Sequence, residues 1–256
     1  MSAYANLDNS IINELPPGRT PIKTAVIPDA RRKEVIKRID TACTNNQQAY
    51  WVCTLIDESD ILQAEAAEAT ATKLATLLPN VKVGLLHGRM KPHEKIKIME
   101  RFKANHIDLL VATTVIEVGV DVPNASLMVI ENSERLGLAQ LHQLRGRVGR
   151  GAIDSYCLLL YRAPLSTNGS QRLAALRATN DGFVIAEKDL ELRGAGQVLG
   201  TQQTGIMSFR IADLNRDADL LESAKKAEKA IFEDYPDSIQ PLIDRWIGGK
   251  KDYAQV

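Results

Sequence analysis

Residues 140–151 read QLHQLRGRVGRG, and the interpretation of the whole chain starts from this segment. Arg145, Arg147 and Arg150 fall within six positions, with glycines between them and no acidic residue. Guanidinium groups match phosphate oxygens, and residues three apart share a helix face, so Arg147 and Arg150 can contact one anion. The segment predicts an arginine finger for phosphoryl transfer. A solvated basic turn, or a patch that only holds nucleic-acid backbone, explains the arginines alone equally well.

Short apolar, β-branched runs lie on both sides of this segment and alternate with longer helical patterns. The expected strands are 24–27, 49–55, 82–87, 108–113, 126–131 and 155–161. The expected helices between them are 29–45, 60–78 and 91–105. Strands joined by helical crossovers form parallel sheets, so the pattern predicts an α/β fold whose sheet is flanked by helices on both faces.

The alternation stops after residue 161. Residues 170–179 and 184–193 are expected to form two short helices, followed by a glycine-rich loop at 194–205 and a longer helix at 217–232. Pro236 and Pro241 are expected to interrupt the remainder of the chain.

Side-chain spacing supports the expected helix 60–78 and identifies part of the core. Five residues of this helix repeat at helical spacing: Leu62, Ala66, Ala69, Lys73 and Leu77. Tyr50 and Trp51 begin an expected strand, where core packing explains them better than stacking on bases.

The composition is that of a folded protein without an overall charge bias. Of the 256 residues, 45% are hydrophobic, and 32 Lys and Arg balance 32 Asp and Glu. Attraction to nucleic acid therefore requires local patches. Residues 89–103 carry six Lys or Arg against two Glu, whereas residues 57–68 carry five acids and no base. A polarised surface is expected, although ordinary amphipathic helices explain the same pattern.

The cysteines and the N-terminus narrow the class of protein. Cys43, Cys53 and Cys157 lie far apart without C-x-x-C spacing, which argues against a zinc site or a disulfide framework and favours small core residues. The chain shows neither a targeting pattern nor a run of roughly 20 apolar residues that could span a membrane. A cytoplasmic protein without a membrane partner is expected.

Three segments resemble motifs of superfamily 2 helicases. QLRGRVGR at 143–150 resembles motif VI, ATTVIEVGVDVP at 112–123 resembles motif V, and LHGRM at 86–90 resembles the element before it. The resemblance implies a RecA-like helicase C-terminal domain in which Arg147 and Arg150 are catalytic.

The same resemblance assigns roles around motif V. It implies that Thr113, Thr114 and Glu117 lie towards DNA and the interdomain cleft. It also implies that the nucleotide lies near three residues: Gly119, Asp121 and Gln143. Because threonine and aspartate are ordinary capping residues, a strand followed by a helix cap explains motif V alone at least as well.

Histidines are the remaining candidates for a metal or phosphate site. They do not cluster at metal-ligand spacings, so no metal site is expected: His87, His93, His106 and His142. His87 ends an expected strand and can bond a phosphate, while Arg89, Lys91 and Lys95 at the same junction are expected to contact backbone phosphates of DNA.

A further resemblance lies beyond the expected sheet. DGFVIAEKDLELRGAG at 181–196, with QQTG at 202–205, resembles the translocation motif of the RecG and Mfd families. The resemblance implies that Arg172, Arg193 and Gln203 couple nucleotide state to movement on duplex DNA. The opening segment favours RecG over Mfd.

Two positions depart from the usual RecG pattern and leave the basic character of the 194–205 loop in doubt. Ala195 stands where RecG proteins more often have proline, and Gln202 stands where arginine is frequent.

The motifs that bind ATP and Mg²⁺ are absent from the 256 residues, which contain no G-x-x-x-x-G-K-[ST] loop and no D-E-x-H or D-E-x-Q sequence. The resemblance implies that a preceding RecA-like domain binds both, that a wedge domain recognises DNA junctions, and that neither ATP nor Mg²⁺ binds tightly to this chain alone. The chain is expected to be a fragment that is inactive by itself.

Within the expected fragment, four regions follow from the pattern. Residues 1–21 form a connecting segment, 22–163 the RecA-like domain, 164–213 the translocation motif, and 214–256 the C-terminal helices and tail. The expected whole is a monomeric ATP-dependent DNA helicase that remodels stalled forks and recombination junctions. An Mfd-like translocase and a non-catalytic nucleic-acid-binding module are the alternatives.

Overall fold

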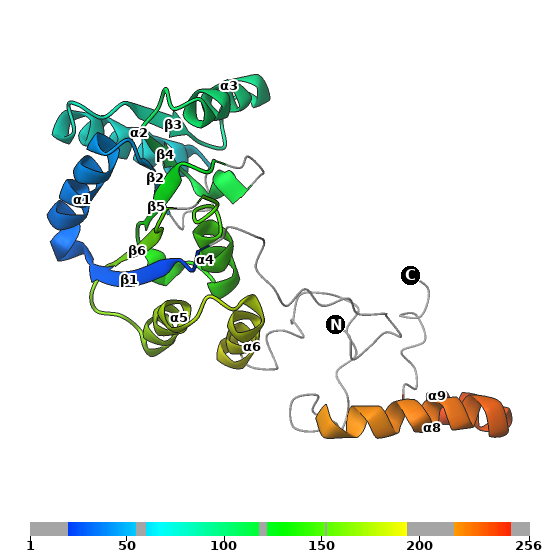
Figure 1. Ribbon diagram of the computed structural model, residues 1–256. Helices are drawn as coiled ribbons and strands as arrows, with labels where there is room; N and C mark the ends of the chain where they lie inside the picture. The colour runs from blue at the N-terminus through cyan, green and yellow to red at the C-terminus, as the bar shows by residue number, and fades with distance from the viewer. Residues whose placement is uncertain (1–19, 55–59, 118–121, 152, 194–217, 247–256) are drawn as a thin grey trace. The chain divides into compact units, whose positions relative to one another are not determined.

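Six parallel strands form the sheet (Figure 1). The computed structural model describes residues 20–54, 60–117, 122–151, 153–193 and 218–246. The strands are β1 (Lys23–Pro28), β2 (Gln48–Val52), β3 (Val83–Leu86), β4 (Leu109–Ala112), β5 (Ala125–Ile130) and β6 (Tyr156–Tyr161). Their order across the sheet is β1-β6-β5-β2-β4-β3, and the predicted parallel sheet is confirmed.

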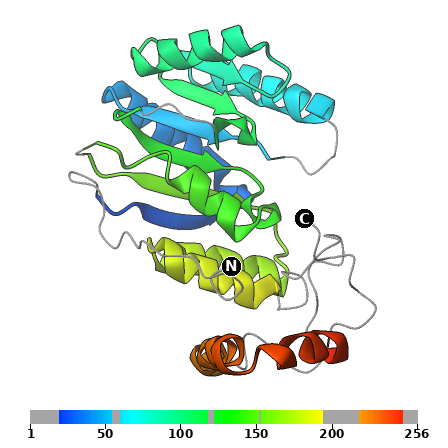
Figure 2. The ribbon, with the colours of Figure 1, turned by 90° about the vertical axis from the view of Figure 1, so that its right-hand side faces the viewer.

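Helices cover both faces of this sheet, as Figures 1 and 2 show. One face packs against α1 (Arg32–Thr44) and α2 (Asp60–Leu77). The other packs against α3 (Pro92–Lys103), α4 (Leu138–Arg145), α5 (Thr167–Ala178) and α6 (Gly182–Arg193). Three short 3-10 turns complete this part: η1 (Asp29–Arg31), η2 (Thr114–Glu117) and η3 (Ser133–Arg135).

The chain divides into two compact units, and the sheet belongs to the unit that spans residues 14–192. The described residues of the other unit form η4 (Ala218–Leu220), α8 (Leu221–Asp234), η5 (Pro236–Ser238) and α9 (Ile239–Trp246). The two prolines do not prevent helix formation there. Pro236 begins η5 and Pro241 is the third residue of α9, where a missing N–H costs no intrahelical hydrogen bond.

Alternation along β2 shows how one strand supplies both faces of the core. All five of its residues are buried. Trp51 packs towards α1 and α2, and Tyr50 packs towards α3, where its ring lies edge-on at 4.9 Å from that of Phe102. The prediction that Tyr50 and Trp51 are core residues is confirmed.

The helix α2 buries a different set of residues from the repeat that was used to predict it. Leu62 and Leu77 are exposed. Among its described side chains, those of Ala64, Ala67 and Leu74 are buried, and Leu78 directly after the helix is buried too. Alanines occur throughout this helix, so its sequence offers two apolar stripes, and the sheet selects the one that carries Leu74.

The three cysteines are buried in the core, as predicted, and their thiols are free. Burial raises the pKa of Cys43 and of Cys157 to about 12, so both thiols are protonated near neutral pH. None of the described helices is long and apolar enough to cross a bilayer.

Candidate functional site

The turn that carries Arg147 and Arg150 lies at the amino edge of the sheet, near the starts of β1 and β5. It follows α4 and precedes β6. A Cβ atom at Gly151 would lie 2.4 Å from the carbonyl oxygen of Pro123, just before β5, and one at Gly149 would lie 3.5 Å from the oxygen of Thr20, just before β1. The turn therefore packs against the segments that enter two strands.

Arg147 and Arg150 are not on a helix, so the prediction that they share a helix face is wrong. The helix α4 ends at Arg145, and Gly149 has φ +77°, a left-handed conformation that does not continue a helix. Both arginines are half-buried, and Arg150 Nε donates to Gly146 O at 3.3 Å. A glycine turn, rather than helical periodicity, places the two guanidinium groups.

Arg145 differs from the two half-buried arginines of this segment because it is fully buried. It is 2% exposed, and its Nη1 donates to Leu176 O at 2.6 Å and Thr179 O at 2.8 Å. Burial lowers the pKa of this guanidinium from its ordinary value. The cluster inferred from three arginines therefore reduces to Arg147 and Arg150.

A second group of predicted site residues lies at the opposite, carboxyl edge of the sheet. Thr113 follows β4 and is buried, and its backbone N–H donates to Leu86 O at the end of β3. His87 follows Leu86, and its Nε2 lies 3.4 Å from Glu68 Oε1. Among the described residues, His87 Nδ1 and Thr113 Oγ1 are buried without a hydrogen-bond partner. Arg89 beside them is exposed.

Arg172 connects α5 to the segment before α4. Its Nη2 donates to Glu134 O at 2.9 Å and its Nη1 to Leu136 O at 3.1 Å. The translocation residue inferred from the sequence therefore contacts the segment that leads into the arginine turn.

The other predicted site residues are placed less completely. Gln143 is exposed on α4, and Thr114 is half-buried at the start of η2. Glu117 ends η2 and Arg193 ends α6, but their side chains lie outside the described structure. Three predicted residues lie wholly outside it: Gly119, Asp121 and Gln203. The 194–205 loop, with Ala195 and Gln202, lies outside it as well.

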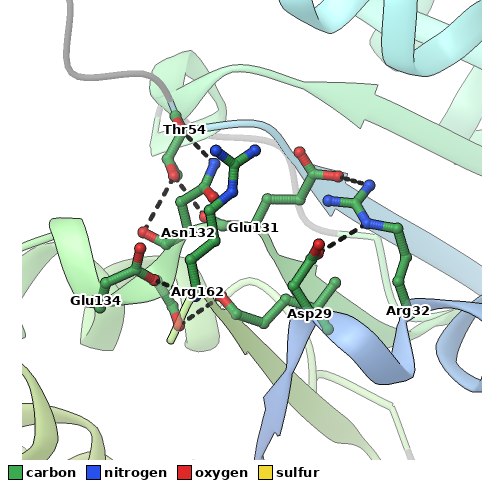
Figure 3. Close-up of polar contacts among 9 residues, drawn as sticks. Asp29, Arg32, Thr54, Glu131, Asn132, Glu134 and Arg162 are labelled. Carbon is green, nitrogen blue, oxygen red and sulfur yellow. Dashed lines mark hydrogen bonds and ion pairs between the residues drawn. The ribbon is translucent and has the colours of Figure 1, made fainter. Parts of the chain in front are cut away.

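A polar network at the carboxyl edge was not predicted (Figure 3). Thr54 Oγ1 donates to Glu131 O, and Asn132 Nδ2 donates to Thr54 O at 3.2 Å. Arg32 forms ion pairs with Glu131 and, at 2.9 Å, with Asp29. The only sequence signals are polar residues directly after two apolar strands, and they do not reveal which residues pair.

Gly149→Ala in this chain should lower the free energy of unfolding by about 1–2 kcal/mol, because a left-handed conformation strains any residue with a Cβ. The new methyl would also lie 2.9 Å from Ile22 Cγ1. Urea denaturation of the variant measures the effect.

Gly146→Ala is the matched control for this prediction. Gly146 lies in the same turn with φ −65°, and its nearest neighbour beyond the adjoining residues would be 3.4 Å away. Equal stability losses in the two variants would show that backbone conformation at Gly149 is unimportant.

The sequence and the fold of this chain are similar to those of known helicases. Residues 31–152 match the helicase conserved C-terminal domain, and residues 179–246 match domain 3, C-terminal, of the ATP-dependent DNA helicase RecG. A yeast DEAD-box splicing factor, Prp28, shares the fold at 19% identity and TM-score 0.50, with 73% of this chain and 39% of that chain covered. The sheet and its arginine turn thus define a helicase C-terminal domain.

The chain belongs, more particularly, to the RecG family. It is 59% identical over its full length to RecG of Escherichia coli K12 and 58% identical to RecG of Haemophilus influenzae, and it spans 37% of the length of each. A structure of RecG bound to a three-way DNA junction matches 82% of this chain, and 27% of that one, at 43% identity and TM-score 0.64.

Proposed function

We propose that the protein to which this chain belongs is an ATP-dependent DNA helicase that remodels branched DNA, and that this chain supplies its arginine fingers. The observation that carries the proposal is the glycine turn, which holds Arg147 and Arg150 together at one edge of the sheet. Similar proteins along the whole chain are named ATP-dependent DNA helicase RecG. The match to the RecG domain at 179–246 favours this family over an Mfd-like translocase.

The residues present fit the phosphates of ATP but not the whole nucleotide complex. Two guanidinium groups on one turn suit phosphate oxygens. The sequence has no lysine-bearing phosphate loop, and the described residues contain no cluster of side chains suited to a metal ion. A bound ATP–Mg²⁺ complex supplies the phosphoryl group and charge neutralisation, and a domain outside this chain would hold most of it.

The two edges of the sheet separate the proposed nucleotide and DNA contacts. Gly119 and Asp121 precede Pro123 in sequence, and Pro123 lies against Gly151 of the arginine turn, which supports a nucleotide role for both. His87, Arg89 and Thr113 lie at the carboxyl edge, where we assign contacts with DNA phosphates. Thr114 and Glu117 follow Thr113 in η2, and we assign them to the DNA side. Gln143 is on α4, the helix that leads to the arginine turn, and we assign it to the nucleotide.

Hydrolysis and unwinding assays test the proposal. The full-length protein should hydrolyse ATP faster in the presence of a three-way DNA junction and should separate its strands. The 256-residue chain should do neither, because it lacks the phosphate loop. Junction-independent hydrolysis by the full-length protein, or hydrolysis by this chain alone, would contradict the assignment.

A further inference from the structure

Arg145 is a buried cation whose side-chain partners among the described residues are two backbone carbonyls, a hydroxyl and an imidazole nitrogen. Its Nη1 donates to Leu176 O and Thr179 O and lies 3.4 Å from Thr24 Oγ1, and its Nη2 lies 3.1 Å from His142 Nδ1. Within the described residues, no carboxylate is among its partners. Desolvating a guanidinium is costly, and carbonyls at and just after the end of α5 offset part of that cost.

The contacts of Arg145 join two parts of the protein with separate roles. Arg145 is the last residue of α4 and lies two residues before Arg147. Leu176 is in the last turn of α5, and Thr179 lies between α5 and α6. One side chain therefore links the arginine turn to the α5–α6 connection.

Close packing reinforces this link. A Cβ atom at Gly182, the first residue of α6, would lie 3.2 Å from His142 Nε2 on α4. In the reverse direction, Arg172 of α5 donates to Glu134 O and Leu136 O ahead of α4. Hydrogen bonds thus join α4 to the end of α5 at Arg145 and join α5 to the segment before α4 at Arg172, and α6 begins against α4.

We propose that Arg145 is a positioning residue that makes the α5–α6 pair follow movements of the turn carrying Arg147 and Arg150. Its side chain is buried and does not face solvent. The inference rests on the function proposed above, because it assigns α5 and α6 to the movement on DNA and the arginine turn to hydrolysis. It predicts that breaking the link separates hydrolysis from strand separation.

The test compares junction unwinding with junction-stimulated ATP hydrolysis in the full-length protein carrying Arg145→Met. Methionine fills the buried site without donating hydrogen bonds. Hydrolysis should stay within about threefold of the wild type, while unwinding should fall by about tenfold or more, as expected for lost coupling contacts. Arg38→Met is the control, because Arg38 is an exposed arginine on α1, a helix that has no part in the inference, and it should leave both rates unchanged.

Each result decides between coupling and a merely structural role. Parallel losses of hydrolysis and unwinding in a folded Arg145→Met protein, or no loss of either, would overturn the inference. If thermal denaturation shows that Arg145→Met is unfolded, Arg145→Lys is used to decide between coupling and a structural role. Lysine keeps the charge but lacks the planar fork, so the ratio of unwinding to hydrolysis should again fall, and an unchanged ratio would overturn the inference.

Arg147→Ala in the same assay separates this inference from the proposed function. Normal hydrolysis by Arg147→Ala would remove Arg147 from the finger assignment. Lost hydrolysis in Arg147→Ala, together with an unchanged ratio in the Arg145 variants, would leave the fingers in place and refute only the coupling role.

Discussion

ATP hydrolysis by the full-length protein should slow by about 10³-fold or more when Arg147 is replaced by alanine, and Arg150→Ala should act in the same direction. An arginine finger neutralises charge that develops on the transferring phosphoryl group, and alanine cannot replace that contact. Both arginines are half-buried on a turn in which Gly149 has a left-handed conformation. Steady-state hydrolysis with saturating junction DNA measures the loss.

DNA affinity should be unaffected in the same variants. The proposed DNA contacts at His87 and Thr113 follow the carboxyl ends of β3 and β4, whereas the arginine turn packs against the segments that precede β1 and β5. Arg177→Ala, at an exposed position on α5, controls for the loss of a positive charge. Hydrolysis at the wild-type rate in both finger variants would refute the assignment, and a matching loss of junction binding would show a DNA-binding role instead.

The sheet was predictable because each of its strands corresponds to a short apolar run in the sequence. Strands covered on both faces need no polar alternation, and β4 and β5 are buried at every residue. Their helical crossovers then required parallel pairing. The order of the strands in space could not be read from these runs, because apolar residues pair with many neighbours equally well.

The arginine turn was recognised from sequence, but its geometry was not. Periodicity suggested one helix face for Arg147 and Arg150, whereas the structure ends α4 at Arg145. Gly146 and Gly149 are the signal for this ending, since glycine commonly follows a helix. The sequence does not indicate that Arg145 is buried while Arg147 and Arg150 are only half-buried. The acceptors of Arg145 are backbone carbonyls more than 30 residues away in sequence.

The network at the carboxyl edge depends on still longer separations. Arg32 and Glu131 are 99 positions apart in sequence, and they meet because α1 follows β1 while Glu131 follows β5 (Figure 3). Arg32 also lies over the ring of Trp51, with its guanidinium carbon 5.5 Å from the ring centroid. A single sequence offers no means of pairing these residues, although Glu131 ends the expected strand 126–131 and Arg32 lies in the expected helix 29–45.

Removing Arg32 should therefore lower the free energy of unfolding by more than removing a solvent-exposed arginine does. The Glu131 side chain is only 8% exposed. Arg32→Ala would leave this carboxylate buried without its cation, which is expected to lower the free energy of unfolding by about 3–5 kcal/mol. Urea denaturation of this chain measures the change.

Two further variants distinguish a buried charge from simple loss of contacts. Adding Glu131→Gln to Arg32→Ala removes the uncompensated charge, so the double variant should recover about 1–2 kcal/mol relative to Arg32→Ala. Arg31→Ala breaks the adjacent pair with Glu34, whose side chains are 59% and 62% exposed, and a solvent-exposed pair contributes about 1 kcal/mol or less. If Arg31→Ala and Arg32→Ala were equally destabilising, burial of Glu131 would not be the cause, and the carboxyl edge would not depend on this ion pair.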